Sequence, residues 1–348
     1  MNRDLDAERI LYLSEREVAV ALTKVDAVAV IADALKRHAW KLTKLPAESY
    51  LSWQTPEGAF ARSLGLPGLI QGETAEIGLK IINSSLANEP RGLPRASGLT
   101  LLFCETTARV KAIVGAARIS ALRTACVTAI AVDLLGTARV ESLAVSGAGV
   151  LAKAHLDLLL DRLPELRVVR IFDVSREKSR ALAAALRAEL GDREVSVEVS
   201  ETAKEAVIGA DVVVPVTTTT TGYIEAGWLQ PGALVVNVSL DDPLPEVMLK
   251  ADRLVVDDWG LVRADDRRLL GRMWREGLIA DSIGVPADGR RPVDAELGEI
   301  VAGLKPGRRR PDEVIVVNPF GLGILDVAVA HEVYRAALKL GLGSYVER

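Results

Sequence analysis

Short apolar runs alternate with segments of helical periodicity through the middle of the chain. Apolar runs of the kind buried in parallel sheets occupy residues 142–145, 168–172, 195–199, 211–216, 234–239 and 254–257. Apolar residues recur at helical spacing in the segments between several of them, at residues 150–163, 175–190 and 201–209. Strands that alternate with helices predict an α/β domain, in which a parallel sheet carries helices on both faces.

The N-terminal part of the chain has a different pattern. Residues 1–45 predict a short strand and then a helix over residues 25–42, with lysines and arginines opposite its apolar side. Short strand-like pieces separated by Gly, Pro and Asn follow at residues 50–53, 68–71, 76–83, 98–103 and 111–114. This region therefore predicts a β-rich module, either a small curved sheet or a barrel.

Two long apolar segments, residues 119–135 and 324–340, predict buried helices. Arg123 is the anomaly in the first, because a charge in apolar surroundings must be paired or must face a ligand. A structural ion pair with a nearby carboxylate is the alternative to a ligand. No strand is expected after the second segment, so we expect this helix to pack back on the N-terminal module. Residues 265–276 predict a further helix, and residues 315–317 a late strand.

A glycine-rich turn follows the first buried strand of the α/β region. Residues 147–152 read GAGVLA, the G-x-G-x-x-A form of the dinucleotide-binding fingerprint of Rossmann-type domains. Gly147 permits the tight turn, Gly149 lets the backbone approach a pyrophosphate, and Ala152 keeps the helix close to the sheet. The N-terminus of that helix offers free N–H groups to phosphates. Asp173 ends the next strand, where a carboxylate accepts hydrogen bonds from a ribose and repels a 2′-phosphate, which predicts NAD rather than NADP.

Polar residues follow the later strands of the predicted sheet. Ligands of parallel sheets bind beyond the carboxyl ends of the strands. We therefore expect residues 217–219, Ser239 and Asp242 to lie on the same rim as Gly147. Asp242 is the candidate for proton transfer, and an ordinary Asp-Pro turn is the alternative for this residue.

Three basic residues are candidates for binding an anionic substrate. Lys80 lies on a predicted strand and faces the same side as Gly78 and Ile82, a mostly apolar side, although a surface lysine would also fit there. Arg123 and Arg95 add positive charge. An arginine holds a carboxylate through two hydrogen bonds and so orients it, as hydride transfer to a nicotinamide requires.

Composition narrows the classes of function. The 348 residues suffice for two domains, and a net charge of −4 gives no support for binding nucleic acid or an anionic membrane. Two cysteines and three scattered histidines form no metal-ligand pattern, so no metal is expected. The chain has no apolar stretch long enough to span a membrane, and its first residues do not resemble a secretion signal. We expect a cytoplasmic protein.

Several of these motifs together resemble the ornithine cyclodeaminase/μ-crystallin family. They are Lys80, Asn83, Asn88, the Gly92-Leu93 pair, the ALRTA run at 121–125 and the glycine turn, in that order, followed by a late Asp. Three stretches are most similar to the branch that makes 2,3-diaminopropionate: GLPRASG (92–98), NVSLDDPLPEVML (237–249) and NPFGLGILDVAVAHEVYRAA (318–337). Members of that branch oxidise an N-(2-amino-2-carboxyethyl)-L-glutamate adduct with NAD.

The resemblance implies a fold and a set of roles. Residues 1–125 and 318–348 would form an α+β domain for substrate binding and dimerisation, and residues 126–317 an NAD-binding Rossmann domain. Lys80 and Arg123 would bind the substrate α-carboxylate, and Asp242 would be the catalytic aspartate. Arg95 is a further candidate for substrate binding. The candidate contacts to the cofactor are Thr124, Gly147, Ala148, Gly149, Val150, Leu151, Asp173, Thr217, Thr218 and Ser239.

Two stretches depart from the family pattern. Members usually carry a basic residue in the early strand before the lysine, whereas residues 48–53 contain none. A histidine is expected after the late Val-Asp-Asp, where this chain has residues 259–263, WGLVR. These departures predict a smaller, less acidic or more apolar amino-acid-derived substrate, as in a natural-product pathway.

We therefore predict an NAD(H)-dependent homodimeric oxidoreductase that acts on the C–N bond of an amino acid, an amino-acid adduct or a cyclic imine. Two alternatives are considered. The first is a redox-neutral cyclodeaminase of ornithine or lysine, which would release no net NADH. The second is a non-catalytic, crystallin-like protein that binds NAD(P)H.

Overall fold

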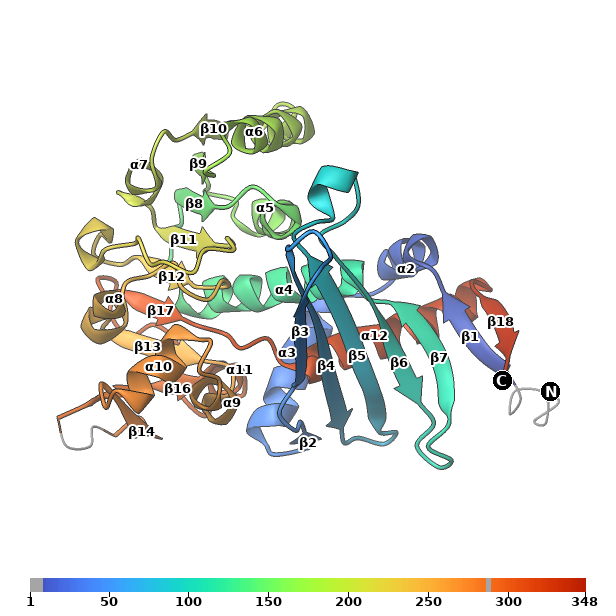
Figure 1. The fold of residues 1–348 in the computed structure, drawn as a ribbon. Helices are drawn as coiled ribbons and strands as arrows, with labels where there is room; N and C mark the ends of the chain where they lie inside the picture. Colours follow the sequence, from blue (N-terminus) through green and yellow to red (C-terminus); the bar gives the residue numbers. More distant parts are fainter. Residues whose placement is uncertain (1–8, 286–288) are drawn as a thin grey trace. The chain divides into compact units, whose positions relative to one another are not determined.

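The computed structural model describes residues 9–285 and 289–348, and the chain divides into two compact units (Figure 1). The first unit contains the residues up to Arg123 together with Gly321–Arg348, and the second contains Thr124–Phe320. One boundary falls within helix α4 (Ala117–Leu135), and the other lies just before helix α12 (Gly323–Leu340). The last helix thus belongs to the same unit as the N-terminal strands.

The first unit is built on a mixed sheet that has eight strands within the described residues. Their order is β18-β1-β7-β6-β5-β4-β2, and β3 also pairs with β4. Strands β1 and β7 are parallel, and the other neighbours are antiparallel. The strands are β1 (Arg9–Leu13), β2 (Thr43–Lys44), β3 (Ser49–Gln54), β4 (Phe60–Ile70), β5 (Glu76–Ser85), β6 (Ala96–Phe103), β7 (Val110–Gly115) and β18 (Ser344–Glu347).

Helix α12 packs against β4, β5 and β6, and its first turn lies very close to the sheet. A Cβ atom at Gly68 would lie 2.8 Å from Ile324 Cγ2, and one at Gly323 would lie 2.8 Å from Leu66 Cβ. Because neither glycine has a side chain, the helix N-terminus can approach the strand backbone. This close approach sets the depth at which the side chains of the first turn enter the core.

The second unit has a parallel sheet in the order β10-β9-β8-β11-β12-β17-β13-β16. Its strands are β8 (Ser142–Ser146), β9 (Val168–Phe172), β10 (Ser196–Val199), β11 (Val212–Pro215), β12 (Leu234–Val236), β13 (Arg253–Val256), β16 (Ala295–Glu296) and β17 (Ile315–Val317). The β14 (Ile279–Ile283) and β15 (Arg291–Val293) strands form a separate pair. The predicted Rossmann-type sheet is confirmed.

The second unit contains the predicted helices and also three helices that were not predicted. They are α5 (Val150–Arg162), α6 (Arg176–Leu190), α7 (Ala203–Val207), α8 (Pro245–Lys250), α9 (Trp259–Ala264), α10 (Leu269–Arg275) and α11 (Leu297–Val301). Helices α8, α9 and α11 were not predicted, and α7 and α10 are shorter than expected. The helix predicted over residues 265–276 begins only at Leu269. The Asp265 carboxylate instead accepts hydrogen bonds from the backbone and side chain of Arg267, which forms a turn before the helix.

Two features of the first unit differ from the predictions. One helix was predicted there before the strands, but the structure has α2 (Glu15–Leu22) as well as α3 (Ala27–Ala39). The expectation that no strand follows the last helix is wrong, because β18 pairs antiparallel with β1. Gly341 and Gly343 have positive φ angles of 66° and 97° and turn the chain back toward the sheet. All four β18 residues are exposed, so this strand has no buried face that would produce an alternation of apolar and polar residues in the sequence.

No helix within the described ranges is long and apolar enough to cross a membrane. Among the same residues, no group of three or more His, Cys, Asp or Glu side chains is placed to hold a metal ion. Cys104 and Cys126 are both free thiols.

Candidate functional site

Lys80 is almost completely buried in the first unit, on the face of β5 that is covered by α12. Its side chain is 2% exposed, and its Nζ atom lies 2.9 Å from Asp326 Oδ1. The ammonium also donates a hydrogen bond of 2.8 Å to Ser120 Oγ. Burial lowers the pKa of Lys80 to about 8; the Asp326 carboxylate opposes this shift, whereas the Arg123 charge adds to it. The surface alternative for this lysine is therefore wrong.

Arg123 reaches the same carboxylate from helix α4. Its Nε atom lies 3.1 Å from Asp326 Oδ2, and the aspartate side chain is 0% exposed. The arginine also approaches the connection before α12, because a Cβ atom at Gly321 would lie 2.8 Å from Arg123 Nη1. Gly321 has a φ angle of 92°, in the region that favours glycine. Arg123 thus has the ion pair that was considered as the structural alternative.

Lys80, Asp326 and Arg123 form a cluster that has more positive than negative charge. Two cations share one carboxylate, so the Lys80–Asp326–Arg123 cluster carries a net charge of about +1 while Lys80 is protonated. Charges removed from water are stabilised by partners of opposite sign. The single carboxylate balances only one of these cations, and the cluster is therefore suited to bind an anion such as a substrate carboxylate.

Asp326 is a residue that the sequence reasoning missed. It lies in the first turn of α12, among residues that are otherwise apolar, and it is fully buried. A carboxylate in such a segment raises the same question as Arg123 did in residues 119–135, because both charges need partners. A positive and a negative charge, each in an otherwise apolar helix, could therefore have been predicted to form an ion pair.

The glycine turn of the second unit has the geometry that a dinucleotide requires. Gly147 has a φ angle of 99°, and a Cβ atom there would lie 2.8 Å from the Val216 carbonyl oxygen. Gly149 precedes α5, and a Cβ atom there would have no neighbour within 4 Å. Val150, the first residue of α5, is 76% exposed. The open space over Gly149 and the free N–H groups of α5 therefore fit a pyrophosphate.

Asp173 follows β9 and stabilises this turn through a hydrogen bond. Its Oδ2 atom accepts a hydrogen bond of 2.8 Å from the backbone N–H of Ala148, and its Oδ1 atom accepts one of 2.8 Å from Ser175. A carboxylate has about four acceptor positions, so these bonds leave capacity for ribose hydroxyls. The neighbouring Val174 is 95% exposed, which offers an apolar surface beside the carboxylate.

Asp242 lies at the centre of a buried hydrogen-bonded group in the second unit. Its Oδ1 atom accepts hydrogen bonds from Thr217 Oγ1 (2.8 Å) and from the Tyr223 hydroxyl (2.9 Å). Its Oδ2 atom is buried and has no hydrogen-bond partner. Burial raises the pKa of the Asp242 carboxyl, although the hydrogen bonds from Thr217, Tyr223 and Ser239 oppose that shift. The carboxyl is thus prepared to hold or release a proton, and one of its oxygens is available to a ligand.

The structure brings together several predicted residues of the second unit. The Thr217 backbone N–H donates a hydrogen bond of 2.8 Å to Ser239 Oγ, and Val216 lies against Gly147. Tyr223, which no sequence motif had singled out, joins this group through Asp242. Its partner is 19 residues away along the chain, so the contact depends on how the loops fold.

The remaining candidates are placed as follows. Thr124 is the first residue of the second unit, and Leu151 lies within the first turn of α5. Thr218 is exposed in the loop after β11. Arg95 is half-buried just before β6 and has no bond to Lys80 or Arg123. Residues 259–263, where the family pattern has a histidine, form most of α9, and their Trp259 is buried.

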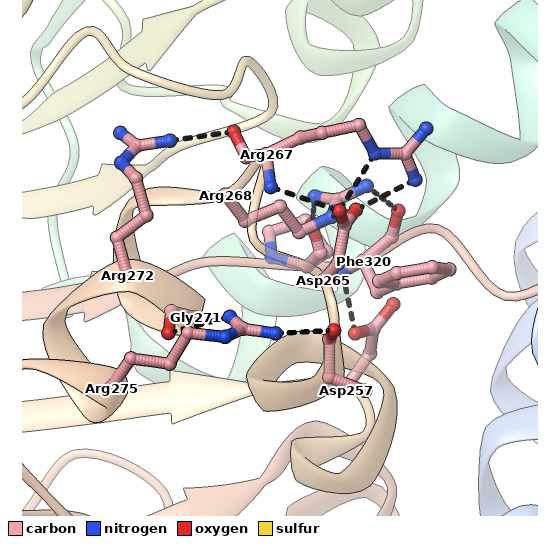
Figure 2. A network of polar contacts seen from close by, with 10 residues as sticks. Asp257, Asp265, Arg267, Arg268, Gly271, Arg272, Arg275 and Phe320 are labelled. Carbon is pink, nitrogen blue, oxygen red and sulfur yellow. Dashed lines mark hydrogen bonds and ion pairs between the residues drawn. The ribbon is translucent and has the colours of Figure 1, made fainter.

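An arginine-rich network surrounds the start of α10 in the second unit (Figure 2). Arg272 pairs with Asp241 Oδ1 at 2.5 Å and donates a hydrogen bond of 2.7 Å to the Arg267 carbonyl oxygen. Arg268 donates to the Phe320 carbonyl oxygen at 2.7 Å, and the Phe320 N–H donates to Asp257 Oδ1 at 2.6 Å. Arg272 thus fixes Asp241, the residue next to Asp242, and Arg268 and Asp257 fix Phe320, the last residue of the second unit.

Comparison with known proteins gives consistent results along the whole chain. The model of the ornithine cyclodeaminase/mu-crystallin family matches residues 11–340. N-((2S)-2-amino-2-carboxyethyl)-L-glutamate dehydrogenase of Staphylococcus aureus is 32% identical over 99% of this chain and 98% of its own. Alanine dehydrogenase of Archaeoglobus fulgidus is 28% identical over 97% of this chain and 98% of its own. The protein in the crystal structure of CmnK is 37% identical in sequence. The match covers 98% of each chain, and the two structures superimpose with a TM-score of 0.88. The family predicted from the sequence is confirmed.

The Asp326→Asn variant tests the ion cluster. Removing the carboxylate leaves two buried cations without their counter-charge, so we expect the free energy of unfolding to fall by about 3 kcal/mol. Denaturant unfolding measures this change. Glu57→Gln is the matched control, since it breaks an exposed ion pair with Arg91 and should change stability by less than about 1 kcal/mol. Equal stability of Asp326→Asn and the unaltered protein would contradict the described role of this carboxylate.

Proposed function

Because the chain belongs to the ornithine cyclodeaminase/mu-crystallin family, we propose that it is an NAD-dependent oxidoreductase acting on the C–N bond of an amino acid or amino-acid adduct. The Lys80–Asp326–Arg123 cluster, with its surplus positive charge, is the observation that carries this proposal. Relatives that match nearly the whole chain are named as dehydrogenases of amino acids or amino-acid adducts. An amino-acid α-carboxylate is the anion that such enzymes share as a substrate group.

The residues of the second unit support NAD as the cofactor. Gly147, Gly149 and the N-terminus of α5 would hold its pyrophosphate, and Asp173 would accept hydrogen bonds from its adenosine ribose. The negative charge of Asp173 disfavours a 2′-phosphate, which supports NAD over NADP. The cofactor, when bound, accepts a hydride from the substrate α-carbon.

Lys80 and Arg123 bind the substrate α-carboxylate in this proposal. The ammonium contributes a point charge, and the planar guanidinium can donate two parallel hydrogen bonds that orient the carboxylate. Asp326 keeps both cations in place from a fully buried position. A fixed carboxylate orients the α-carbon and its hydrogen, which is a large part of what a transfer reaction needs from the protein.

Asp242 carries the proton of the reaction. The substrate loses the α-hydrogen as a hydride and one N–H proton, which Asp242 accepts through the unpartnered Oδ2 atom, and a C=N bond forms. Water then adds to the C=N carbon, and the C–N bond breaks to give a 2-oxo acid and an amine. The hydrogen bonds from Thr217 and Tyr223 fix the other oxygen, so the orientation of the carboxyl is set before substrate binds.

We further propose that the protein acts as a homodimer in the cytoplasm, where amino acids and NAD are available together. A structurally similar archaeal alanine dehydrogenase, 26% identical with a TM-score of 0.81, is described as a dimer with bound NAD. Candidate contacts to the cofactor at Thr124, Ala148, Val150, Leu151, Thr218 and Ser239 belong to the same proposal.

The Asp242→Asn variant tests the proton-transfer role. An amide cannot take up the substrate proton, so we expect kcat to fall by a factor of about 100 or more, with NAD affinity nearly unchanged. The assay is NADH absorbance during incubation with NAD and N-(2-amino-2-carboxyethyl)-L-glutamate, or L-alanine. Asp312→Asn, at an exposed ion pair with Arg310, is the control. Full activity of Asp242→Asn would refute the role, and turnover without net NADH would point to cyclodeamination.

The pKa of Lys80 predicts a pH dependence of anion binding. This pKa is about 8, so the lysine is mostly protonated at pH 7 and mostly neutral at pH 9; Asp326 and, more weakly, Glu48 favour the protonated form, and Arg123 disfavours it. Only the protonated form attracts a carboxylate, so the inhibition constant of propionate against the amino acid should rise up to tenfold per pH unit above about pH 8. Propionate itself does not titrate there. A constant value from pH 7 to 9.5 would rule out Lys80 as the anion site.

A further inference from the structure

Tyr223 is joined to Asp242 by its side chain and by its backbone. Its hydroxyl donates a hydrogen bond of 2.9 Å to Asp242 Oδ1. The backbone N–H groups of Tyr223 and Ile224 each donate a hydrogen bond of 2.9 Å to the Asp242 carbonyl oxygen. Ile224 also forms a parallel β-bridge with Pro243. The segment that carries the phenol is thus fixed to the same residue that its hydroxyl contacts, and the fold sets the hydrogen bond between the two side chains.

The residue before Tyr223 lets the two segments lie this close together. A Cβ atom at Gly222 would lie 3.2 Å from the carbonyl oxygens of both Asp241 and Pro243. These are backbone atoms of the segment that contains Asp242, so a larger residue at position 222 would push the two segments apart. Glycine at this position therefore permits the approach that brings the Tyr223 hydroxyl to the carboxylate.

The Tyr223 phenol is a permanent hydrogen-bond donor at this position. Burial, and after it the negative charge of Asp242, raises the pKa of Tyr223 far above its ordinary value. The charge of Asp173, which follows β9, acts in the same direction, and a hydrogen bond with Ser146 opposes these effects. The phenol therefore stays protonated and does not exchange a proton with a substrate. Any effect of this hydroxyl on the reaction acts through Asp242.

Thr217 donates a second hydrogen bond to the same carboxylate oxygen. Its Oγ1 atom lies 2.8 Å from Asp242 Oδ1 and accepts a hydrogen bond of 3.1 Å from the Thr219 N–H. The hydroxyl has one hydrogen, which the carboxylate receives. A proton on Oδ1 would displace at least one of the hydrogens that Thr217 and Tyr223 direct at this oxygen. Oδ2 has no hydrogen-bond partner within the described ranges, so a proton that Asp242 takes up belongs on Oδ2.

Hydroxyl groups favour the ionised form of Asp242. Burial raises the pKa of its carboxyl, and this shift is opposed by hydrogen bonds from three hydroxyl groups, those of Thr217, Tyr223 and Ser239. The cation that α10 places beside this segment, Arg272, pairs instead with Asp241 at 2.5 Å. A hydrogen bond to the ionised form of a carboxyl lowers its affinity for a proton. Loss of the Tyr223 hydroxyl should therefore leave Asp242 protonated up to a higher pH.

We propose that Tyr223 is a positioning residue of the reaction, whose hydroxyl keeps Asp242 ionised until the substrate binds and directs the substrate proton to Oδ2. This inference rests on the proposed function, in which Asp242 accepts one N–H proton of the substrate. In that step the substrate N–H bond breaks and its proton binds Oδ2, the α-hydrogen leaves as a hydride to the cofactor, and a C=N bond forms. A carboxyl that is already protonated cannot take this proton, so the tyrosine sets the lowest pH at which oxidation runs.

The Tyr223→Phe variant removes the hydroxyl and keeps the ring. We expect the pH below which kcat/KM for oxidation falls to move upward by about one unit, because the carboxyl loses a hydrogen bond that favours its ionised form. NADH absorbance with NAD and N-(2-amino-2-carboxyethyl)-L-glutamate, or L-alanine, measures the profile. Tyr345→Phe, on the exposed strand β18, is the matched control and should keep the profile of the unaltered enzyme. A tyrosine that only packs against its neighbours would change stability and leave the profile of Tyr223→Phe unchanged, which would overturn the inference.

A titration without turnover separates this inference from the proposed function. Carbon NMR of protein labelled at the aspartate carboxyl carbons reports the pH midpoint of each aspartate, and the signal that is missing from Asp242→Asn identifies Asp242. A midpoint about one pH unit higher in Tyr223→Phe supports the role of Tyr223, even if no substrate is oxidised. Equal midpoints overturn it, even if the enzyme oxidises amino acids. Should Tyr223→Phe fail to fold, a ring-fluorinated tyrosine at position 223 keeps the shape and donates more strongly, so it should lower the midpoint; an equal or higher midpoint then overturns the inference.

Discussion

A single buried carboxylate, Asp326, holds two cations that come from different elements of the first unit. Lys80 is supplied by β5 and Arg123 by α4, and neither would be stable in its apolar surroundings without this partner. Because Gly68 and Gly323 let the first turn of α12 approach the sheet, the carboxylate reaches the depth of the lysine. Packing of the last helix therefore determines the electrostatics of the cluster. One negative charge cannot neutralise two cations, and this surplus is the basis of the proposed anion site.

The second unit contributes functional groups by a different route. Its parallel strands end at one rim, and the loops beyond them bring Thr217, Ser239 and Asp242 into hydrogen-bonded contact. Asp242 differs from Asp326 because the contacts of its carboxylate within residues 9–285 and 289–348 are hydrogen bonds from hydroxyl groups and not ion pairs. Its burial raises its pKa, whereas Asp326 is matched by two positive charges. Two buried carboxylates in one chain thus serve different purposes, one as a fixed counter-charge and the other as a group suited to proton transfer.

Local patterns predicted much of this architecture. The fingerprint at residues 147–152 and the β-branched runs gave the parallel sheet, because each signal lies within a few residues of sequence. The residues that were missed depend on distant contacts. Asp326 meets Lys80 across most of the chain, and Tyr223 meets Asp242 only when the loops beyond the strands fold together. Strand β18 escaped prediction because it is short and exposed, and its pairing with β1 joins the two ends of the chain.

The most direct test of the central claim is a crystal structure of the protein with NADH and an unreactive carboxylate such as propionate. We predict carboxylate oxygens at about 2.7–3.2 Å from Lys80 Nζ and from the Arg123 guanidinium, with both ion pairs to Asp326 retained. A carboxylate bound elsewhere, with Lys80 and Arg123 in contact only with Asp326, would show that the cluster is purely structural and would contradict the account.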